Sequence, residues 1–215
     1  MIFDCRTHDV RLQLAEIYEI KPIIYTVVLD GQEKYGCCDN IPLRGKYFSF
    51  EYKSILNPSD FGVFFVGEHC GFDFIEILKS KNLNSFDPVF FDPYSRNINN
   101  SIGKSNNNLL STDKFFKMTP LNKEVFIAIN LICISWNKVS YGNLSAIINF
   151  CSTSKIDTQN WVIDFINKII GKDALGRNLI KIYQELQDKY GIRRDYSFEN
   201  LVSIINKNNW QNNIQ

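Results

Sequence analysis

One segment in the first half of the chain changes from a strand pattern to a helix pattern at a single glycine, and this change most constrains the fold. Lys46–Ile55 alternates its side chains with a period of two, which predicts a half-buried β-strand. Gly62–Val66 predicts a further strand. Gly67 then interrupts the strand pattern, and Phe72–Ser80 places apolar residues at helical spacing. The segment therefore predicts a small sheet with a flanking helix.

The residues before this segment predict one more helix and two more strands. Val10–Ile20 has apolar residues near one helical face, and Pro22 ends that helix. Ile23–Leu29 is apolar and β-branched, which is typical of a strand. An Asp-Gly pair then supplies a hairpin turn that leads to a strand at Glu33–Cys38. We expect these strands to pair in an antiparallel sheet.

The second half of the chain is expected to be helical. Thr119 is a typical helix-capping residue, and Pro120 fits the first helical position. Gly171 and Gly191 mark the ends of two later helices. Helices are expected at about 120–135, 141–150, 158–170, 172–190 and 197–206.

The segment between the two halves is polar. Asp92–Ser111 is rich in Asn and Ser and has no apolar period, so it cannot bury enough surface to order itself. We therefore predict an α+β protein. It comprises a small antiparallel β-rich module with flanking helices at 1–92, a linker at 93–112 and a helical domain at 113–208.

Composition and charge restrict the class of protein. Among 215 residues, 24 are Lys or Arg and 23 are Asp or Glu, and the net charge of +1 argues against a broad phosphate-binding surface. The N-terminus has no apolar export signal, and no apolar run has the length of a membrane span. We expect a cytoplasmic, soluble protein with no membrane partner. Abundant Asn, Lys, Ile and Phe suggest a bacterium or a mobile element as its source.

Three cysteines and a histidine are candidate zinc ligands: Cys37, Cys38, His69 and Cys70. A structural zinc site needs about four nitrogen or sulfur ligands, and the turn at Gly67 aims Cys70 back toward the preceding strands. Adjacent residues of an extended chain point in opposite directions, so each adjacent pair is expected to offer one ligand. The alternative is that these cysteines are small buried apolar residues in a reducing compartment.

A resemblance supports the zinc interpretation. The string FFVGEHCGFDFIEIL resembles the V-G-x-x-C and helix half of small zinc-binding β-modules in uncharacterised bacterial and phage proteins. Those modules open their hairpin with Cys-x-x-Cys, and here Tyr35 stands in the place of the first cysteine if Cys38 is the second. LNKEVFIAINLICISWNKVS is similar to the helical segment that follows such modules. The resemblance covers about the central third of the chain and implies a zinc-binding architecture with one altered ligand position, without implying an activity.

A second pattern in the same region is that of a nuclease. Glu51 and Lys53 share one face of a predicted strand, and Asp39 lies upstream of them. In PD-(D/E)xK-type nucleases such carboxylates hold Mg²⁺, and the lysine orients or activates the attacking water. The alternative is a solvated strand face without catalysis. No serine or cysteine triad and no phosphate-binding glycine loop can be assembled from the sequence.

The C-terminal half offers a candidate binding surface. Thr119–Phe150 is compatible with a helix-turn-helix-like unit, although two packed core helices explain it as well. A locally basic segment follows, and its candidate contacts to nucleic acid or to a protein are Lys172, Arg177, Lys181, Arg193 and Arg194. We therefore expect a non-enzymatic binding or accessory protein that acts on nucleic acid or a protein complex. A Mg²⁺-dependent nuclease and an inhibitor-type interaction module are the alternatives.

Overall fold

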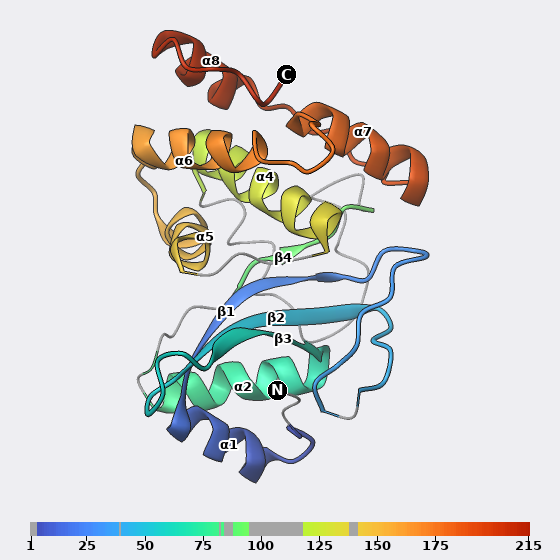
Figure 1. Cartoon of the computed structure of the whole chain (residues 1–215), viewed down its shortest axis with the longest axis vertical. Coiled ribbons are helices and arrows are strands. Elements are labelled where there is room, and N and C mark those ends of the chain that lie inside the picture. The colour runs from blue at the N-terminus through green and yellow to red at the C-terminus, as the bar shows by residue number, and fades with distance from the viewer. Residues whose placement is uncertain (1–3, 39, 82, 84–87, 95–117, 138–141) are drawn as a thin grey trace. The chain divides into compact units, whose positions relative to one another are not determined.

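The computed structural model of the protein describes residues 4–38, 40–81, 83, 88–94, 118–137 and 142–215. The chain divides into two compact units: Met1–Phe91 with Tyr141–Ser145, and Asp92–Ser140 with Ala146–Gln215. The N-terminal unit contains a four-stranded sheet with helices, and the described part of the C-terminal unit is helical (Figure 1). The predicted α+β class is therefore confirmed.

The sheet of the N-terminal unit is mixed. Its strands are β1 (Tyr18–Val27), β2 (Lys46–Ser54), β3 (Phe61–Gly67) and β4 (Phe90–Phe91), in the order β3-β2-β1-β4. β2 pairs antiparallel with both β1 and β3, as expected, whereas β4 pairs parallel to β1. The short parallel strand is the difference from the antiparallel sheet that the sequence predicts.

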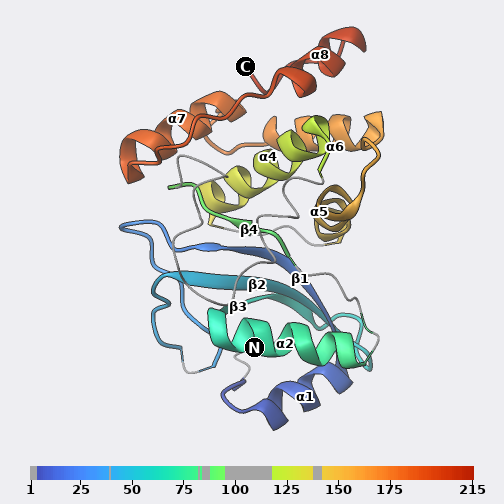
Figure 2. The same ribbon diagram turned by 180° about the vertical axis from the view of Figure 1, so that it is seen from behind.

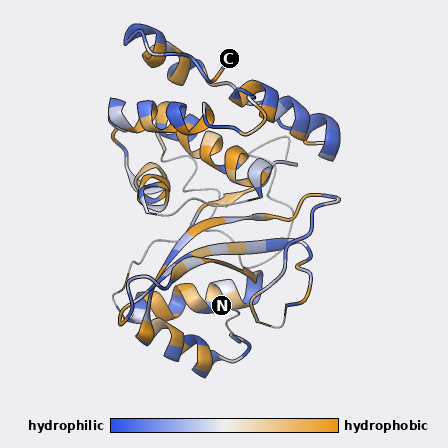
Figure 3. Ribbon diagram, in the orientation of Figure 1, coloured by the Kyte–Doolittle hydropathy of each residue, from blue (hydrophilic) through white to orange (hydrophobic). Residues whose placement is uncertain are grey.

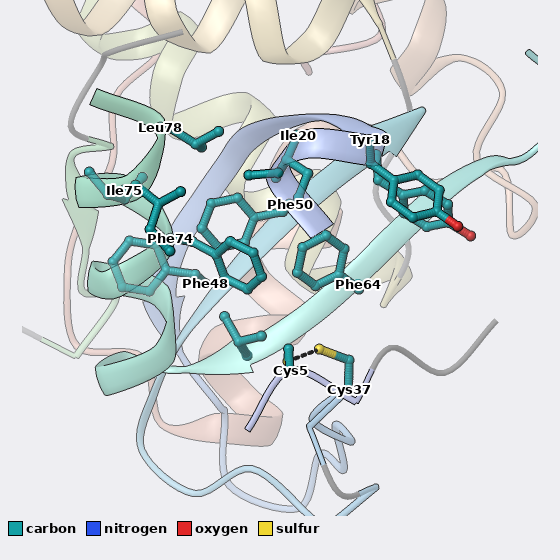
Figure 4. Packing of buried hydrophobic residues seen from close by; sticks show 14 of the residues in the cluster. Cys5, Tyr18, Ile20, Cys37, Phe48, Phe50, Phe64, Phe74, Ile75 and Leu78 are labelled. Carbon is teal, nitrogen blue, oxygen red and sulfur yellow. Dashed lines mark hydrogen bonds between the residues drawn. The ribbon is translucent and has the colours of Figure 1, made fainter. Parts of the chain in front are cut away.

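Two helices cover one face of this sheet (Figure 2): α1 (His8–Ile17) and α2 (Glu68–Ser80). Phe50 of β2 stacks on Phe64 of β3 and lies 5.5 Å from Phe74 of α2 between ring centroids. These rings form the centre of the apolar core (Figure 4). The side chains of β2 from Tyr47 to Tyr52 are buried on both faces of the strand, whereas the alternating pattern predicts that one face is exposed to solvent.

The first predicted helix is too long at its C-terminal end. α1 ends at Ile17 and β1 begins at Tyr18, so Pro22 lies inside a strand instead of ending a helix. The pairing of β1 with β2 shifts register between Pro22 and Ile24. A β-bulge tolerates proline because the missing N–H is not needed in the ladder there.

The predicted strand at Glu33–Cys38 is absent, because this segment has only an isolated bridge between Tyr35 and Pro42. The predicted turn is present, and Gly31 has a φ of +77° that favours glycine. However, β1 pairs with β2 along nearly its whole length, and the intervening residues form a loop. β2 is longer than the Glu33–Cys38 segment, so it can form more backbone hydrogen bonds with β1.

The C-terminal unit is built around one buried helix. Its helices are α4 (Pro120–Trp136), most of α5 (Asn143–Thr153), α6 (Asn160–Ile170), α7 (Leu179–Tyr190) and α8 (Glu199–Lys207). Thr119 caps α4 by accepting a hydrogen bond from the backbone of Asn122, as the sequence predicts. α4 is hydrophobic along most of its length (Figure 3), and α6, α7 and α8 pack against it or one another.

α7 begins seven residues later than predicted. Asp173 accepts hydrogen bonds from the backbone N–H groups of Leu175 and Arg177, which holds the preceding residues in turns. Asn178 then caps α7 by accepting from the backbone of Lys181. Apart from Pro93 and Tyr94, the predicted linker lies outside the described residues. None of the described helices has the length and apolar character needed to cross a membrane.

Candidate metal centre

Four cysteines from three separate segments gather in the N-terminal unit, and we call them the sulfur cluster: Cys5, Cys37, Cys38 and Cys70. Cys5 precedes α1, Cys37 and Cys38 lie in a turn of the β1–β2 loop, and Cys70 lies in the first turn of α2. The sulfur atoms of Cys5, Cys37 and Cys38 all lie within 4.8 Å of one another, so these three could hold a metal ion. Cys70 Sγ lies 3.7 Å from Cys38 Sγ.

The sulfur cluster lies at the border of the apolar core. Cys5 is 0% and Cys37 9% exposed, and Cys38 and Cys70 pack against the same core as half-buried side chains. The backbone N–H of Cys37 donates to the carbonyl of Phe65, which fixes the turn to the edge of β3. Figure 4 shows the Cys5 and Cys37 side chains pointing toward each other, and a hydrogen bond joins their sulfur atoms at 2.7 Å.

Two features of this cluster differ from the sequence-based expectation. Cys37 and Cys38 were expected to point in opposite directions, but they lie in a turn, so both sulfur atoms reach the same group. Cys5 was missed entirely. It lies 32 residues before Cys37 in a segment with no ligand motif, and only tertiary folding brings the two together.

The remaining predicted ligand, His69, lies outside the grouped residues. Its side chain is exposed, whereas its neighbour Cys70 is half-buried and faces the core. Consecutive residues of a helix are separated by about 100° around the axis, so the two side chains point in different directions. Of the four predicted ligands, three therefore belong to the sulfur cluster.

The four thiols of the sulfur cluster differ in the direction of their pKa shifts. Hydrogen bonds from Cys37 and Cys38 lower the pKa of Cys5 to about 5, although burial opposes its ionisation. The pKa of Cys37 is raised by its hydrogen bonds to Cys38 and Cys5. The pKa of Cys38 is lowered, chiefly by its hydrogen bond with Cys37, and the pKa of Cys70 is raised by its hydrogen bond to Cys38. Cys5 and Cys38 thus ionise more readily than free cysteine, whereas Cys37 and Cys70 hold their protons more tightly. The thiolate is the form of cysteine that binds metals.

A buried arginine lies against the cluster. Arg11 of α1 is 4% exposed, and its Nη1 donates to the carbonyl of Cys5 at 2.6 Å and to Cys70 Sγ at 3.5 Å. Its Nε donates to the carboxylate of Asp73, which also contacts His8 Nδ1 at 2.9 Å. Burial disfavours the charge on Asp73, but the hydrogen bonds from Arg11 and His8 outweigh it and lower its pKa.

The residues of the nuclease pattern do not form a comparable group in the described structure. Glu51 is 9% exposed, and its two carboxylate oxygens accept from the backbone N–H of Gly142 at 2.8 Å and from the Ser145 hydroxyl at 3.1 Å. Lys53 is exposed, and Asp39 lies outside the described residues. Ser145, at the start of α5, is itself buried.

The basic residues of the C-terminal unit have different environments. Arg177 is bound inside the unit, because it forms ion pairs with Asp173 at 2.8 Å and with Glu185 at 2.5 Å. Arg194 is half-buried and lies over the ring of Tyr196. The three other predicted contact residues, Lys172, Lys181 and Arg193, are exposed.

Comparison with known proteins places the chain in a family. A family model described as Uncharacterised conserved protein UCP028583 matches residues 4–209. The chain belongs to this family. Searches of curated proteins and of solved structures gave no match. All four members of the sulfur cluster lie within the part of this UCP028583 protein that the family model matches.

Proposed function

We propose that this protein is a non-enzymatic binding protein whose N-terminal unit is stabilised by a zinc ion bound to cysteine thiolates. The observation that carries the proposal is the convergence of Cys5, Cys37 and Cys38, whose sulfur atoms lie within 4.8 Å of one another. Tetrahedral sites made of sulfur ligands are typical of zinc or of iron–sulfur centres. Zinc is the simpler assignment because a single ion needs only these few thiolates.

The burial of the cluster favours a structural role for the metal. Cys5 and Cys37 are closed off from solvent. A catalytic zinc keeps one position open for water or substrate, whereas a structural zinc is enclosed by protein ligands. The three grouped cysteines come from two segments, the residues before α1 and the β1–β2 loop. A zinc ion at this point would link these two segments.

The surface of the N-terminal unit favours a protein as the partner. Four apolar side chains on neighbouring segments are exposed by 46–86%, and we call them the hairpin tip: Ile17, Ile55, Leu56 and Phe61. Ile55 donates its backbone N–H to the carbonyl of Ile17, and Phe61 pairs with Lys53 across the hairpin, which keeps these segments together. Exposed groups of apolar side chains are typical of protein-binding surfaces.

The charges support the same choice of partner. The net charge is +1. Arg177 was predicted to contact nucleic acid, but it already forms ion pairs with Asp173 and Glu185. Nucleic-acid affinity depends mainly on free cations that contact phosphates. The contacts of Glu51 with Gly142 and Ser145 likewise weigh against the nuclease alternative.

Metal analysis of the purified protein tests the zinc centre. We expect about one zinc ion per chain by inductively coupled plasma mass spectrometry, and loss of that zinc in a Cys5→Ser/Cys38→Ser variant. The Cys133→Ser/Cys151→Ser variant is the matched control, since both of these cysteines lie in the C-terminal unit. Iron with sulfide, or no metal after growth with zinc, would overturn the assignment.

The choice of partner is tested by two matched charge-introducing variants. Leu56→Glu/Phe61→Glu alters the hairpin tip, and Lys172→Glu/Lys181→Glu alters the basic surface. We expect cross-linked partner proteins to be lost with the first variant and retained with the second. If the second variant instead abolishes binding to duplex DNA or RNA at low salt while the first does not, the partner is a nucleic acid.

A further inference from the structure

The three grouped cysteines leave a zinc site one ligand short. Structural zinc sites are almost always four-coordinate and tetrahedral, so the site needs one further protein ligand. We propose that Cys70 is this ligand, so that Cys5, Cys37, Cys38 and Cys70 form one closed four-thiolate zinc site whose charge is partly neutralised by Arg11. This inference rests on the proposed zinc centre and names its full ligand set.

Cys70 Sγ lies at the distance of one tetrahedral edge from Cys38 Sγ but outside the group of sulfur atoms that all lie within 4.8 Å of one another, so it must move closer to that group on metal binding. A zinc–sulfur distance of about 2.3 Å gives a sulfur–sulfur separation of about 3.8 Å along the edges of a tetrahedron. Cys38 Sγ and Cys70 Sγ are 3.7 Å apart, which matches this edge. Cys5 Sγ and Cys37 Sγ are 2.7 Å apart, so this pair must separate by about 1 Å on metal binding.

The start of α2 places unused backbone N–H groups near Cys70. Cys70 is the third residue of α2, where backbone N–H groups are not used within the helix. The capping residue is Gly67, which provides no side-chain acceptor for these groups. An anion is stabilised at this end of a helix. In the metal-free protein the hydrogen bond with Cys38 and burial nevertheless raise the pKa of Cys70. A metal ion would displace the proton of Cys70, and the helix end would then stabilise the bound thiolate.

Other nearby side chains are less suited to be the fourth ligand. His69 has an exposed side chain. Asp73 lies one helical turn after Cys70, but its oxygens are bound to Arg11 and His8. Cys70 is the described side chain that both contacts a grouped sulfur atom and packs against the core.

Arg11 places positive charge, which it shares with Asp73, against such a site. Zn²⁺ with four thiolates has a net charge of −2, and a buried charge is costly unless it is compensated. The Arg11 guanidinium is buried, donates to Cys70 Sγ at 3.5 Å and also holds the carbonyl of Cys5. Asp73 fixes its orientation through Nε. Arg11 is therefore a positioning residue for two of the four ligands.

X-ray absorption at the zinc edge tests the ligand set directly. We expect four sulfur neighbours at about 2.3 Å in the wild-type protein. In Cys70→Ser we expect three sulfur atoms with one nitrogen or oxygen atom, and zinc affinity at least tenfold lower. His69→Ala is the matched control and should keep four sulfur atoms and the wild-type affinity. Circular dichroism verifies that each variant is folded.

The outcomes separate this inference from the broader proposal. Zinc bound by three sulfur atoms and one nitrogen or oxygen atom in the wild-type protein would overturn the role of Cys70 and leave the zinc centre standing. Absence of bound zinc would overturn both.

The role of Arg11 has its own readout. Loss of an outer-shell partner typically lowers metal affinity by about 10- to 100-fold. We expect Arg11→Met to weaken zinc binding by this factor with four sulfur neighbours retained, Arg11→Lys to recover part of the affinity, and Arg44→Met, at an exposed site of the β1–β2 loop, to leave it unchanged. Unchanged affinity in Arg11→Met would exclude charge compensation by Arg11.

Discussion

Two arginines show why single residues are difficult to interpret from sequence. Arg11 and Arg177 look like ordinary surface cations in helical or polar segments, yet each is held by carboxylates within its own unit. Arg11 is 4% exposed and reaches the sulfur cluster, whereas Arg177 is bound by Asp173. A count of basic residues in the sequence therefore overestimates the positive charge that is available to a partner. The environment of each guanidinium depends on tertiary contacts that the local sequence does not contain.

The metal-free cluster should make stability depend on pH in a defined direction. The pKa of Cys5 is lowered from 9.0 to about 5, so its thiolate stabilises the fold fully above pH 9, and this contribution is lost as the pH falls to 5. The pKa of Cys37 is raised, so its bound proton stabilises the fold below pH 9, and this contribution is lost as the pH rises further. The free energy of unfolding should therefore rise from pH 5 to about pH 9 and then fall.

Urea unfolding of the chelator-treated protein between pH 5 and 10 measures this dependence, by circular dichroism. One proton contributes at most about 1.4 kcal/mol per pH unit to the slope. Cys5→Ser should flatten the rise between pH 5 and 9, and Cys151→Ser, in the C-terminal unit, should not. An equal slope in wild type and Cys5→Ser would contradict the proposed thiolate.

At the scale of elements, Glu51 is expected to stabilise the start of α5. Its carboxylate accepts from Gly142 and Ser145, and hydrogen bonds to a charged acceptor contribute about 1.5–3 kcal/mol. Glu51→Gln should lower the free energy of unfolding by about 1–3 kcal/mol, because it removes the charge and one acceptor oxygen. Lys53→Gln, at an exposed position of the same strand, should change it by less than about 0.5 kcal/mol. Equal effects in urea unfolding would argue against this role.

Elements with strong local signals were predicted well, and those decided by pairing were not. The alternation of Lys46–Ile55 and the capping pair Thr119-Pro120 located β2 and the start of α4 closely. The strand at Glu33–Cys38 was wrong, because β1 pairs with β2 instead. The candidate site was predicted only in part. Cys5 joins it from a distant segment, and a turn that local propensity does not reveal brings the adjacent cysteines together.

At the scale of the whole molecule, the candidate metal site and the tryptophan side chains lie in different units. The sulfur cluster lies in the N-terminal unit, and the chain's three tryptophans lie in the C-terminal unit: Trp136, Trp161 and Trp210. Each unit has an apolar interior of its own, one around Phe50 and one around α4. A ligand that binds only the folded N-terminal unit should therefore stabilise that unit more than the other.

Zinc removal should consequently affect the two units unequally. Free zinc at a hundredfold excess over its Kd adds about 2.7 kcal/mol of stability, which corresponds to about 10–20 °C in the Tm of a unit of this size. Chelation should accelerate hydrogen–deuterium exchange in peptides from residues 4–91, with a much smaller change in the thermal transition seen by tryptophan fluorescence. The same chelator should change neither signal in Cys5→Ser/Cys38→Ser. If both signals shift equally in the wild-type protein, the metal stabilises the chain as one cooperative unit, and the zinc centre cannot act on the N-terminal unit alone.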